Sequence, residues 1–336
     1  VQKWWISDPA TPQKQPNEIR YPAAGTKNAV LGLARISIAG KKEAINWDND
    51  SFEYLISVSW QKDCEALITV ADRAQQNFVT YSLSESGLKI VHEVTDHEFV
   101  EVIPGQPRWH DGKIVSIIDN RQTDTRELQV AGRVITPPGF QVMSVIDVTS
   151  DYIDVVATSD AVSRDVVRVG YDGSLTELAQ GGVAGATSTT GELQILIESR
   201  LDTHSRTYQL RRGAKTEHYF ESLAETPSFQ PQVHQLKTGP NLVNTAVMFP
   251  RGHVLGSKKL PVMMRPYGGP HHSCVQNGAL TYAIDQWFAD QGFVVIVADN
   301  RGTPGRGPAW DHAIYQDFVK PVLEDQVHAI ADVVAH

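Results

Sequence analysis

The sequence predicts a multidomain protein of β and α/β architecture, in which a partial β-propeller precedes an open α/β sheet. Its 336 residues exceed the size that a single hydrophobic core usually organises. Residues 1–233 contain short runs of β-branched and aromatic residues between polar turns, without helical periodicity. In residues 234–336, apolar strand-like runs alternate with segments of helical period. We therefore place two domains at these two ranges.

The first region is predicted to consist of short strands joined by tight turns. The strand-like runs are residues 53–60, 65–70, 77–83, 113–119, 127–132, 152–158, 166–170, 193–199 and 206–212. Turn dipeptides that suit hairpins occur at Asp111-Gly112, Ala131-Gly132, Asp172-Gly173 and Thr190-Gly191. A sandwich and a propeller both fit such strands. The length of the region favours a propeller, although no strict repeated motif is present.

The second region alternates strands and helices. Strands are expected within 243–252, 258–267 and 292–302, and the last of these is apolar enough to be buried on both faces of a sheet. A helix is expected over 282–293, closed by Gly292, with its apolar residues at helical spacing. A final helix over 322–336 has Glu324 and Asp325 in its first turn, where the helix dipole favours negative charge. The apolar residues expected on the core-facing sides of the two helices are Ile284, Trp287, Phe288, Leu323, Val327, Ile330, Val333 and Val334.

Composition excludes several classes of protein. The net charge of −9 is spread along the chain, so no basic surface for nucleic acid or anionic membrane is expected. No apolar run is long enough to span a bilayer. Cys64 and Cys274 are the only cysteines, which excludes a disulfide framework and a cysteine zinc site. Such cysteine usage favours a reducing compartment, and we expect a cytoplasmic protein.

The run PVMMRPYGGPHHS, residues 261–273, carries the main candidate for a functional residue. Residues 260–264 are expected to form a buried strand, and the prolines and glycines after it stop that strand. Tyr267 is therefore mounted at the tip of a strand. Paired glycines suit a reacting centre, but they suit an ordinary tight turn as well. The residue types alone favour the ordinary turn.

Other polar residues near this run are interpreted as structural. His271 and His272 are adjacent, so in an extended segment their side chains point apart and do not share a metal ion. Asp299 and Arg301 follow a strand, where α/β sheets place their sites, but the surrounding glycines match no nucleotide-binding motif. We expect a structural loop there, and neither a metal nor a cofactor.

Longer runs carry a resemblance to a known family. PYGGPHHS, WFADQGFVVIVADNRGTPGRGPAWDHAI and PVLEDQVHAI resemble the first half of the α/β-hydrolase domain of the prolyl oligopeptidase family of serine peptidases. YPAAGTKNA, RAQQN and TSDYI narrow the resemblance to the dipeptidyl peptidase IV branch. It covers nearly the whole chain and is most specific in residues 234–336.

This resemblance implies a catalytic role for Tyr267. In the family, the tyrosine of this turn places its hydroxyl in the oxyanion hole, and Gly268 and Gly269 would clear space beside it. One such donor contributes about 2.7 to 4 kcal/mol to the stabilisation of a transition state. The resemblance also implies a peptide substrate and a homodimer that forms mainly through the hydrolase domain.

The catalytic triad is not found in the sequence. An α/β-hydrolase presents its serine in a Gly-x-Ser-x-Gly pentapeptide, and none occurs between Val1 and His336. We expect this elbow about 10 to 15 residues beyond His336. The paired glutamates that hold the substrate's amino group in the dipeptidyl peptidase IV branch would precede the WWISDP run. The chain is thus expected to be an inactive fragment.

Two hypotheses for the function of the parent protein remain. The first is a serine peptidase that releases short N-terminal peptides from oligopeptides through an acyl-enzyme intermediate. The alternative is a non-catalytic propeller that binds peptides or proteins and carries a degenerate hydrolase appendage. The intact turn around Tyr267 favours the first hypothesis, but the sequence does not distinguish dipeptidyl, tripeptidyl and acylaminoacyl preferences.

Overall fold

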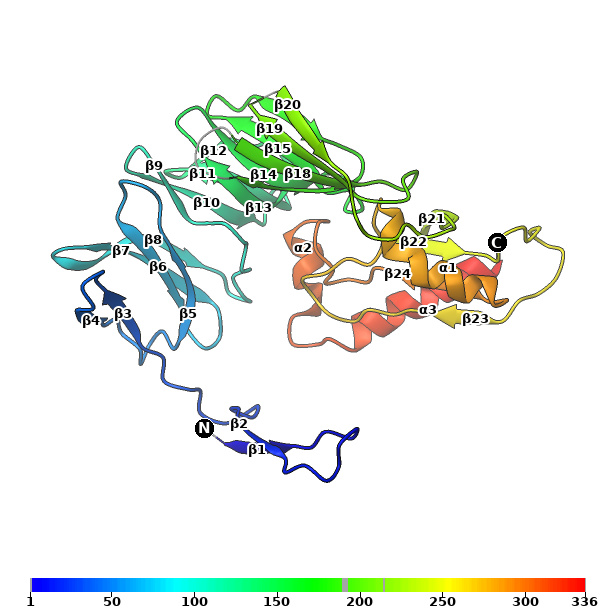
Figure 1. Ribbon diagram of the computed structural model, residues 1–336, viewed down its shortest axis with the longest axis horizontal. Coiled ribbons are helices and arrows are strands. Elements are labelled where there is room, and N and C mark those ends of the chain that lie inside the picture. The colour runs from blue at the N-terminus through cyan, green and yellow to red at the C-terminus, as the bar shows by residue number, and fades with distance from the viewer. Residues whose placement is uncertain (1, 189–192, 214, 336) are drawn as a thin grey trace. The chain divides into compact units, whose positions relative to one another are not determined.

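The computed structural model describes residues 2–188, 193–213 and 215–335. Contacts divide the chain into two compact units, Val1–Val102 and Ile103–His336 (Figure 1). The second unit holds sheets of propeller type as well as the later α/β sheet. The domain boundary after residue 233 stays a prediction.

Antiparallel four-stranded sheets dominate the described residues before Val233, and strands adjacent in sequence pair with one another in each sheet, as in propeller blades. The short hairpins β1 (Lys3–Ile6)–β2 (Asn17–Arg20) and β3 (Leu33–Ile36)–β4 (Lys42–Ile45) come first. The blades are β5 (Tyr54–Ser59), β6 (Ala66–Ala71), β7 (Asn77–Ser84) and β8 (Gly87–Thr95); β9 (Arg108–His110), β10 (Lys113–Asn120), β11 (Thr125–Val130) and β12 (Arg133–Val134); β13 (Gln141–Val148), β14 (Tyr152–Thr158), β15 (Asp165–Gly170) and β16 (Leu175–Ala179); β17 (Val183–Ser188), β18 (Leu193–Ser199), β19 (Thr207–Arg212) and β20 (Lys215–Phe220).

Every run predicted as a strand in this region coincides with one of these strands, and no helix precedes Ala279 in the described residues. The propeller prediction is therefore confirmed. Strands such as β8, β16 and β20 escaped prediction. They have many exposed positions, so their sequences lack the apolar runs that marked the central strands.

The predicted hairpin turns supply backbone conformations that most residues avoid. Asp111 and Gly112 connect β9 to β10 with φ of 47° and 70°, the left-handed values that a type I′ turn requires at both positions. Ala131, between β11 and β12, has φ of 50°. These turns are confirmed, whereas the predicted turn at 190–191 lies outside the described residues.

The propeller core lies between neighbouring blades. Strands β6 and β11 are buried along their whole length. A central strand in a blade has both faces covered by neighbouring blades. The side chains on both faces of β6 and β11 are therefore buried. The largest cluster joins β10 and β11 to β13, β14 and β15 through Val115, Leu128, Val142, Ile153, Val155 and Val167.

Gly105 allows a close backbone approach between two blades. It has φ of +81°, and a Cβ atom there would lie 1.9 Å from the carbonyl oxygen of Val145. We expect Gly105→Ala to reduce the free energy of unfolding by about 3 kcal/mol, through overpacking and left-handed strain together. Gly112→Ala is the matched control, because Gly112 has φ of +70° but open space around it, and it should cost only about 1 kcal/mol. Equal losses in urea unfolding would contradict the steric argument.

The α/β part begins with four strands, β21 (Val233–Thr238), β22 (Val243–Met248), β23 (Val262–Met264) and β24 (Val294–Ala298), in the order β21-β22-β24-β23. Its helices are η1 (Ala279–Tyr282), α1 (Ala283–Asp290), α2 (Pro308–Asp311), η2 (His312–Ile314) and α3 (Lys320–Ala335). Only the pair β23–β24 is parallel. The open α/β sheet that the sequence predicts is therefore a mixed sheet in the described residues. Within the described residues, no helix has the length and apolar character needed to cross a bilayer.

Two strand predictions in this sheet differ in outcome. Every residue of β24 is buried, as predicted, because β24 pairs on both sides and is covered on both faces. The predicted buried strand over 260–264 is shorter, and Val262 in it is 41% exposed. The reason is its position, because β23 lies at the edge of the sheet in the described residues.

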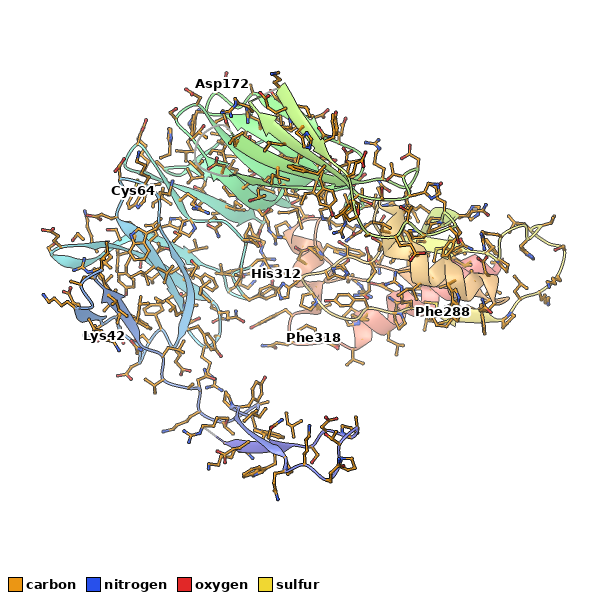
Figure 2. All side chains as sticks on the ribbon, in the orientation of Figure 1. Lys42, Cys64, Asp172, Phe288, His312 and Phe318 are labelled. Atoms are coloured by element: carbon orange, nitrogen blue, oxygen red, sulfur yellow. The ribbon has the colours of Figure 1, made fainter. Side chains whose placement is uncertain are left out.

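Helices α1 and α3 form where the sequence predicts them, but several of the apolar residues expected to face the core are exposed. Leu323 and Val327 in α3 are 59% and 52% exposed, and Trp287 in α1 is 52% exposed. The half-buried Phe288 (Figure 2) and Val333 are exceptions, since each packs against a core cluster of the sheet.

Polar side chains occupy the buried sides of these helices instead. Gln326 donates from Nε2 to the Ala298 carbonyl at 2.9 Å. Gln286 donates to the Phe249 carbonyl at 2.9 Å, and Asp285 lies 2.7 Å from the Arg265 guanidinium. A buried polar group costs little free energy when it is hydrogen-bonded or ion-paired, so these contacts decide which side faces inward.

Candidate functional site

Tyr267 lies at the carboxyl edge of the parallel pair β23–β24. It follows β23 and forms an isolated parallel backbone bridge with Asp299, the residue after β24. Open α/β sheets bind ligands beyond the carboxyl ends of their parallel strands. The structure thus brings Tyr267 and Asp299 together at an edge that is suited to a functional site.

The side chain of Tyr267 is half-buried and turns back over its own loop. Its hydroxyl donates a hydrogen bond to the Pro270 carbonyl oxygen at 2.7 Å. Its ring meets the ring of His272 edge to face, with centroids 5.4 Å apart. The hydroxyl hydrogen is therefore engaged within the turn, and it has to leave Pro270 before it can donate to any ligand.

The two glycines of the turn differ in what they accommodate. A Cβ atom on Gly269 would lie 3.2 Å from the Tyr267 hydroxyl oxygen, tighter than most such contacts, so a side chain there would press on the phenol. A Cβ atom on Gly268 would lie 3.4 Å from Val322, which is an ordinary contact. Gly269 therefore gives Tyr267 the space that the resemblance implied, whereas Gly268 does not border the phenol in this way.

The adjacent histidines do not lie in an extended segment. His271 has φ of 70°, which turns the chain sharply after Pro270. The expectation of an extended segment is corrected, since the left-handed residue lets His272 fold back onto Tyr267. Sequence reasoning missed this packing role, because a positive φ at a histidine has no local sequence signal.

Asp299 anchors the segment that follows the tyrosine turn. Its Oδ1 accepts a hydrogen bond from the Cys274 amide at 2.7 Å, and its Oδ2 accepts one from the Val275 amide at 3.1 Å. Burial raises the pKa of Asp299 to about 6, although the two amide bonds and the charges of Arg164 and Arg265 act in the opposite direction. These contacts agree with the prediction that Asp299 belongs to a structural loop.

Arg301 also has a structural role. It lies 3.0 Å from Asp325 through Nε and 2.8 Å from Glu324 through Nη2. Asp325 is buried and accepts further bonds from the Arg301 amide and from Asn241, each at 2.8 Å. Helix α3 begins at Lys320, so neither acidic residue lies in its first turn, and Asp325 is a buried link rather than a dipole contact.

An ionic cluster joins blade β9–β12 to the segment at α2. Arg126 is 3% exposed and lies 2.8 Å from Asp119 and 3.0 Å from Asp311. His312 (Figure 2) lies 2.7 Å from Arg121 and 3.5 Å from Asp119. Burial alone would raise the pKa of Asp119, but His312 and Arg126 outweigh it and lower the pKa to about 2. Sequence reasoning missed this cluster, whose members are far apart in the chain.

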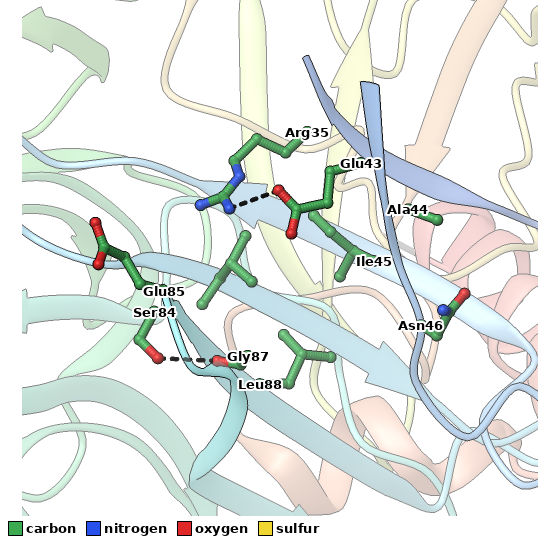
Figure 3. A pocket seen from close by; sticks show the side chains of 10 residues that line it. Arg35, Glu43, Ala44, Ile45, Asn46, Ser84, Glu85, Gly87 and Leu88 are labelled. Carbon is green, nitrogen blue, oxygen red and sulfur yellow. Dashed lines mark hydrogen bonds and ion pairs between the residues drawn. The ribbon is translucent and has the colours of Figure 1, made fainter. Parts of the chain in front are cut away.

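A pocket of about 170 Å³ lies in the unit Val1–Val102, between hairpin β3–β4 and the turn that joins β7 to β8 (Figure 3). The Arg35 guanidinium and the Glu43 carboxylate at its border are 2.8 Å apart. These charges are paired with each other, so they are not poised to act on a ligand. The cysteines likewise show no sign of a site, since Cys64 is an exposed free thiol and burial raises the pKa of Cys274.

Chemically, the phenolic hydroxyl of Tyr267 is a hydrogen-bond donor at the carboxyl edge of the pair β23–β24. A phenol can stabilise an oxyanion when its hydroxyl turns toward the developing charge. The sequence given has no Gly-x-Ser-x-Gly pentapeptide, so no serine elbow of this kind accompanies the Tyr267 hydroxyl within it.

Two family models match the chain. The dipeptidyl peptidase IV (DPP IV) N-terminal region matches residues 1–176, and the prolyl oligopeptidase family matches residues 281–336. Tyr267 lies between the two matched ranges. The matched ranges correspond to the regions of propeller type and of α/β type in the structure.

Named relatives and solved structures are also similar. Probable dipeptidyl-aminopeptidase B of Aspergillus clavatus is 22% identical over 330 residues, covering 85% of this chain and 36% of that protein. Prolyl endopeptidase FAP of Mus musculus is 33% identical over 78 residues, covering 22% of this chain and 10% of that protein. The crystal structure of Porphyromonas gingivalis dipeptidyl peptidase 4 has a TM-score of 0.81 at 19% identity, covering 99% of this chain and 50% of that chain.

The chain therefore spans 36% of the length of the fungal relative and half of the bacterial structure. The structural likeness confirms the predicted fold, a partial β-propeller followed by the start of an α/β-hydrolase domain.

Proposed function

This chain belongs to the dipeptidyl peptidase IV (DPP IV) N-terminal region family, and on that premise we propose that it is part of a serine peptidase that releases short N-terminal peptides from oligopeptides. The observation that carries the proposal is the position of Tyr267. The residue lies at the carboxyl edge of the pair β23–β24, beside a glycine that leaves room for its phenol. The names of the fungal relatives support an exopeptidase.

In the proposed reaction, a serine outside the printed sequence attacks the scissile carbonyl carbon. A histidine takes the serine proton and passes it to the leaving amine as the peptide C–N bond breaks. Water then hydrolyses the acyl-enzyme and returns the serine. Tyr267 donates its hydroxyl hydrogen to the carbonyl oxygen, which carries a negative charge in each tetrahedral intermediate.

The hydrogen bond between Tyr267 and Pro270 is compatible with this role. Rotation about the bond between the ring and the hydroxyl oxygen redirects the hydrogen without moving the ring. A bond to a charged oxygen is about twice as strong as one to a neutral carbonyl, so the exchange favours the transition state. While the Tyr267 hydroxyl donates to the substrate, the Pro270 carbonyl oxygen can accept a hydrogen bond from water.

The test of this function is peptide release by the full-length protein. Chromogenic dipeptides that differ in the residue before the scissile bond are assayed with a free and with an acetylated amino group. We expect the acetylated forms to react about tenfold more slowly or worse, because a charged amino group makes hydrogen bonds that an amide cannot replace. We also expect an organofluorophosphate, which labels activated serines, to abolish turnover.

Turnover of acetylated and free dipeptides at equal rates would contradict an exopeptidase. An absence of both turnover and labelling would support the alternative, a propeller module that binds peptides without cleaving them.

A further inference from the structure

The segment Ser273–Asn277, which follows the tyrosine turn, is held from two sides. On one side is the Asp299 carboxylate, which accepts the amides of Cys274 and Val275. The backbone of the same Asp299 forms the bridge with Tyr267. One residue at the end of β24 therefore fixes the chain before the turn and after it.

On the other side is a propeller loop, residues 160–164, between β14 and β15. Arg164 donates from Nη2 to the hydroxyl oxygen of Ser273. Its Nη1 donates to the carbonyls of Ala161 and Ser163, at 3.0 and 2.7 Å. Those two bonds hold the guanidinium in a single orientation relative to the loop. The bond from Arg164 to Ser273 therefore ties the position of Ser273 to that of the loop.

A second contact joins the same loop to the other end of the segment. The Asn277 amide donates to the Val162 carbonyl at 2.9 Å, and Asn277 Nδ2 donates to the Ser163 hydroxyl oxygen at 2.8 Å. The loop is itself braced by Asp160, whose carboxylate accepts the amides of Val162 and Ser163 at 2.9 and 2.7 Å. The loop thus contacts both ends of the segment, at Ser273 and at Asn277.

The charges on the two sides complement each other. Burial lowers the pKa of Arg164, and the charges of Asp299 and Asp160 oppose that change. Removing a buried guanidinium that interacts electrostatically with buried carboxylates is costly, because those carboxylates stay buried without its charge. Arg164 therefore anchors the segment at its first residue, Ser273.

We propose that Arg164, a residue of the propeller, is a positioning residue that acts on Tyr267 through Ser273. The inference rests on the proposed function of Tyr267. Ser273 follows directly on His272, whose ring packs on the Tyr267 ring. A shift of Ser273 therefore moves His272 and tilts the phenol away from the position of the oxyanion. A misplacement of about 1 Å at a reacting centre can cost on the order of 100-fold in rate.

The experiment is a double-mutant cycle in the full-length protein, with Arg164→Met, Tyr267→Phe and the double variant. We expect Arg164→Met to lower kcat about 10- to 100-fold with KM little changed, because orientation of the phenol matters in the transition state. In the Tyr267→Phe background, the same substitution should cost less than about threefold, since no hydroxyl is left to misplace.

Three further variants separate positioning from general destabilisation. Arg168→Met is the matched control, because Arg168 on β15 pairs with buried Asp154 at 2.9 Å and lies over the Tyr152 ring, so both of these partners belong to the neighbouring strand β14. It should lower thermal stability and leave kcat near that of the wild type. Ser273→Ala removes the acceptor while keeping Arg164, and it should reproduce the loss in kcat even if Arg164→Met fails to fold. Arg164→Lys keeps the charge and should restore part of the rate.

Equal fold-losses from Arg164→Met in the tyrosine and phenylalanine backgrounds would overturn the inference and leave the function of Tyr267 intact. Wild-type kcat in both Arg164→Met and Ser273→Ala would overturn it as well. Wild-type turnover in Tyr267→Phe alone would overturn both the inference and the catalytic role of Tyr267.

Discussion

Tyr267→Phe in the full-length protein is expected to lower kcat and kcat/KM together by about 100- to 1000-fold, with substrate affinity little changed. The physical reason is that the hydroxyl meets the substrate oxygen only when negative charge develops on it, so the lost interaction belongs to the transition state. The measurement is steady-state kinetics on a chromogenic dipeptide substrate of the full-length protein.

Stability should change little in this variant. Phenylalanine keeps the ring and its packing against His272, and it loses one hydrogen bond to the Pro270 carbonyl, which contributes about 0.5 to 1.5 kcal/mol. Tyr171→Phe is the matched control, because the Tyr171 hydroxyl makes the same kind of bond, at 2.7 Å to the Thr149 carbonyl, within a propeller blade. It should show a similar loss of stability with unchanged kinetics.

The opposite pattern would identify a structural tyrosine. If Tyr267→Phe lost several kcal/mol of stability while kcat stayed within about twofold of the wild type, Tyr267 would have no part in oxyanion stabilisation.

The largest effect on stability is expected for Arg126→Met. Arg126 pairs with Asp119 and Asp311, at 2.8 and 3.0 Å, and methionine would leave the buried Asp311 and the partly buried Asp119 without this partner. Removing one member of a buried ion pair typically costs about 3 to 5 kcal/mol. Hydrogen exchange of the amides of β10 and β11 measures this loss locally, in a protein whose domains need not unfold together.

Two comparisons check the cause. Arg35→Met removes a cation from an exposed pair, 2.8 Å from Glu43, and should leave stability almost unchanged, because solvent screens such a pair. Acid should reduce the difference between wild type and Arg126→Met. The folded-state pKa of Asp119, about 2, lies below its ordinary value of 3.8, so its stabilising contribution is present above that value and is lost as pH falls through about 2. A difference that stayed constant down to pH 2 would contradict the ionic explanation.

The sequence by itself determined most central strands of the blades and the two longer helices, but not exposed strands such as β8, β16 and β20. The apolar run that became β24 and the period that became α3 are local properties, since each depends only on residues that are close together in the chain. The turn at Asp111 and Gly112 was equally visible, because few residues adopt left-handed angles. The placement of Tyr267 beyond β23 followed from the prolines and glycines around it.

Only the tertiary structure decided which faces and partners those elements have. Asp325 and Gln326 face inward in α3, while Leu323 faces outward, because Asp325 accepts a hydrogen bond from Asn241 and Gln326 donates one to the Ala298 carbonyl. The bond from Arg164 to Ser273 joins residues that are 109 positions apart in the chain, and no local pattern encodes it. Hydrophobic periodicity reports burial averaged over a helix or strand, whereas a single polar contact depends on the geometry of two separate segments, and that geometry exists only once the sheets have packed.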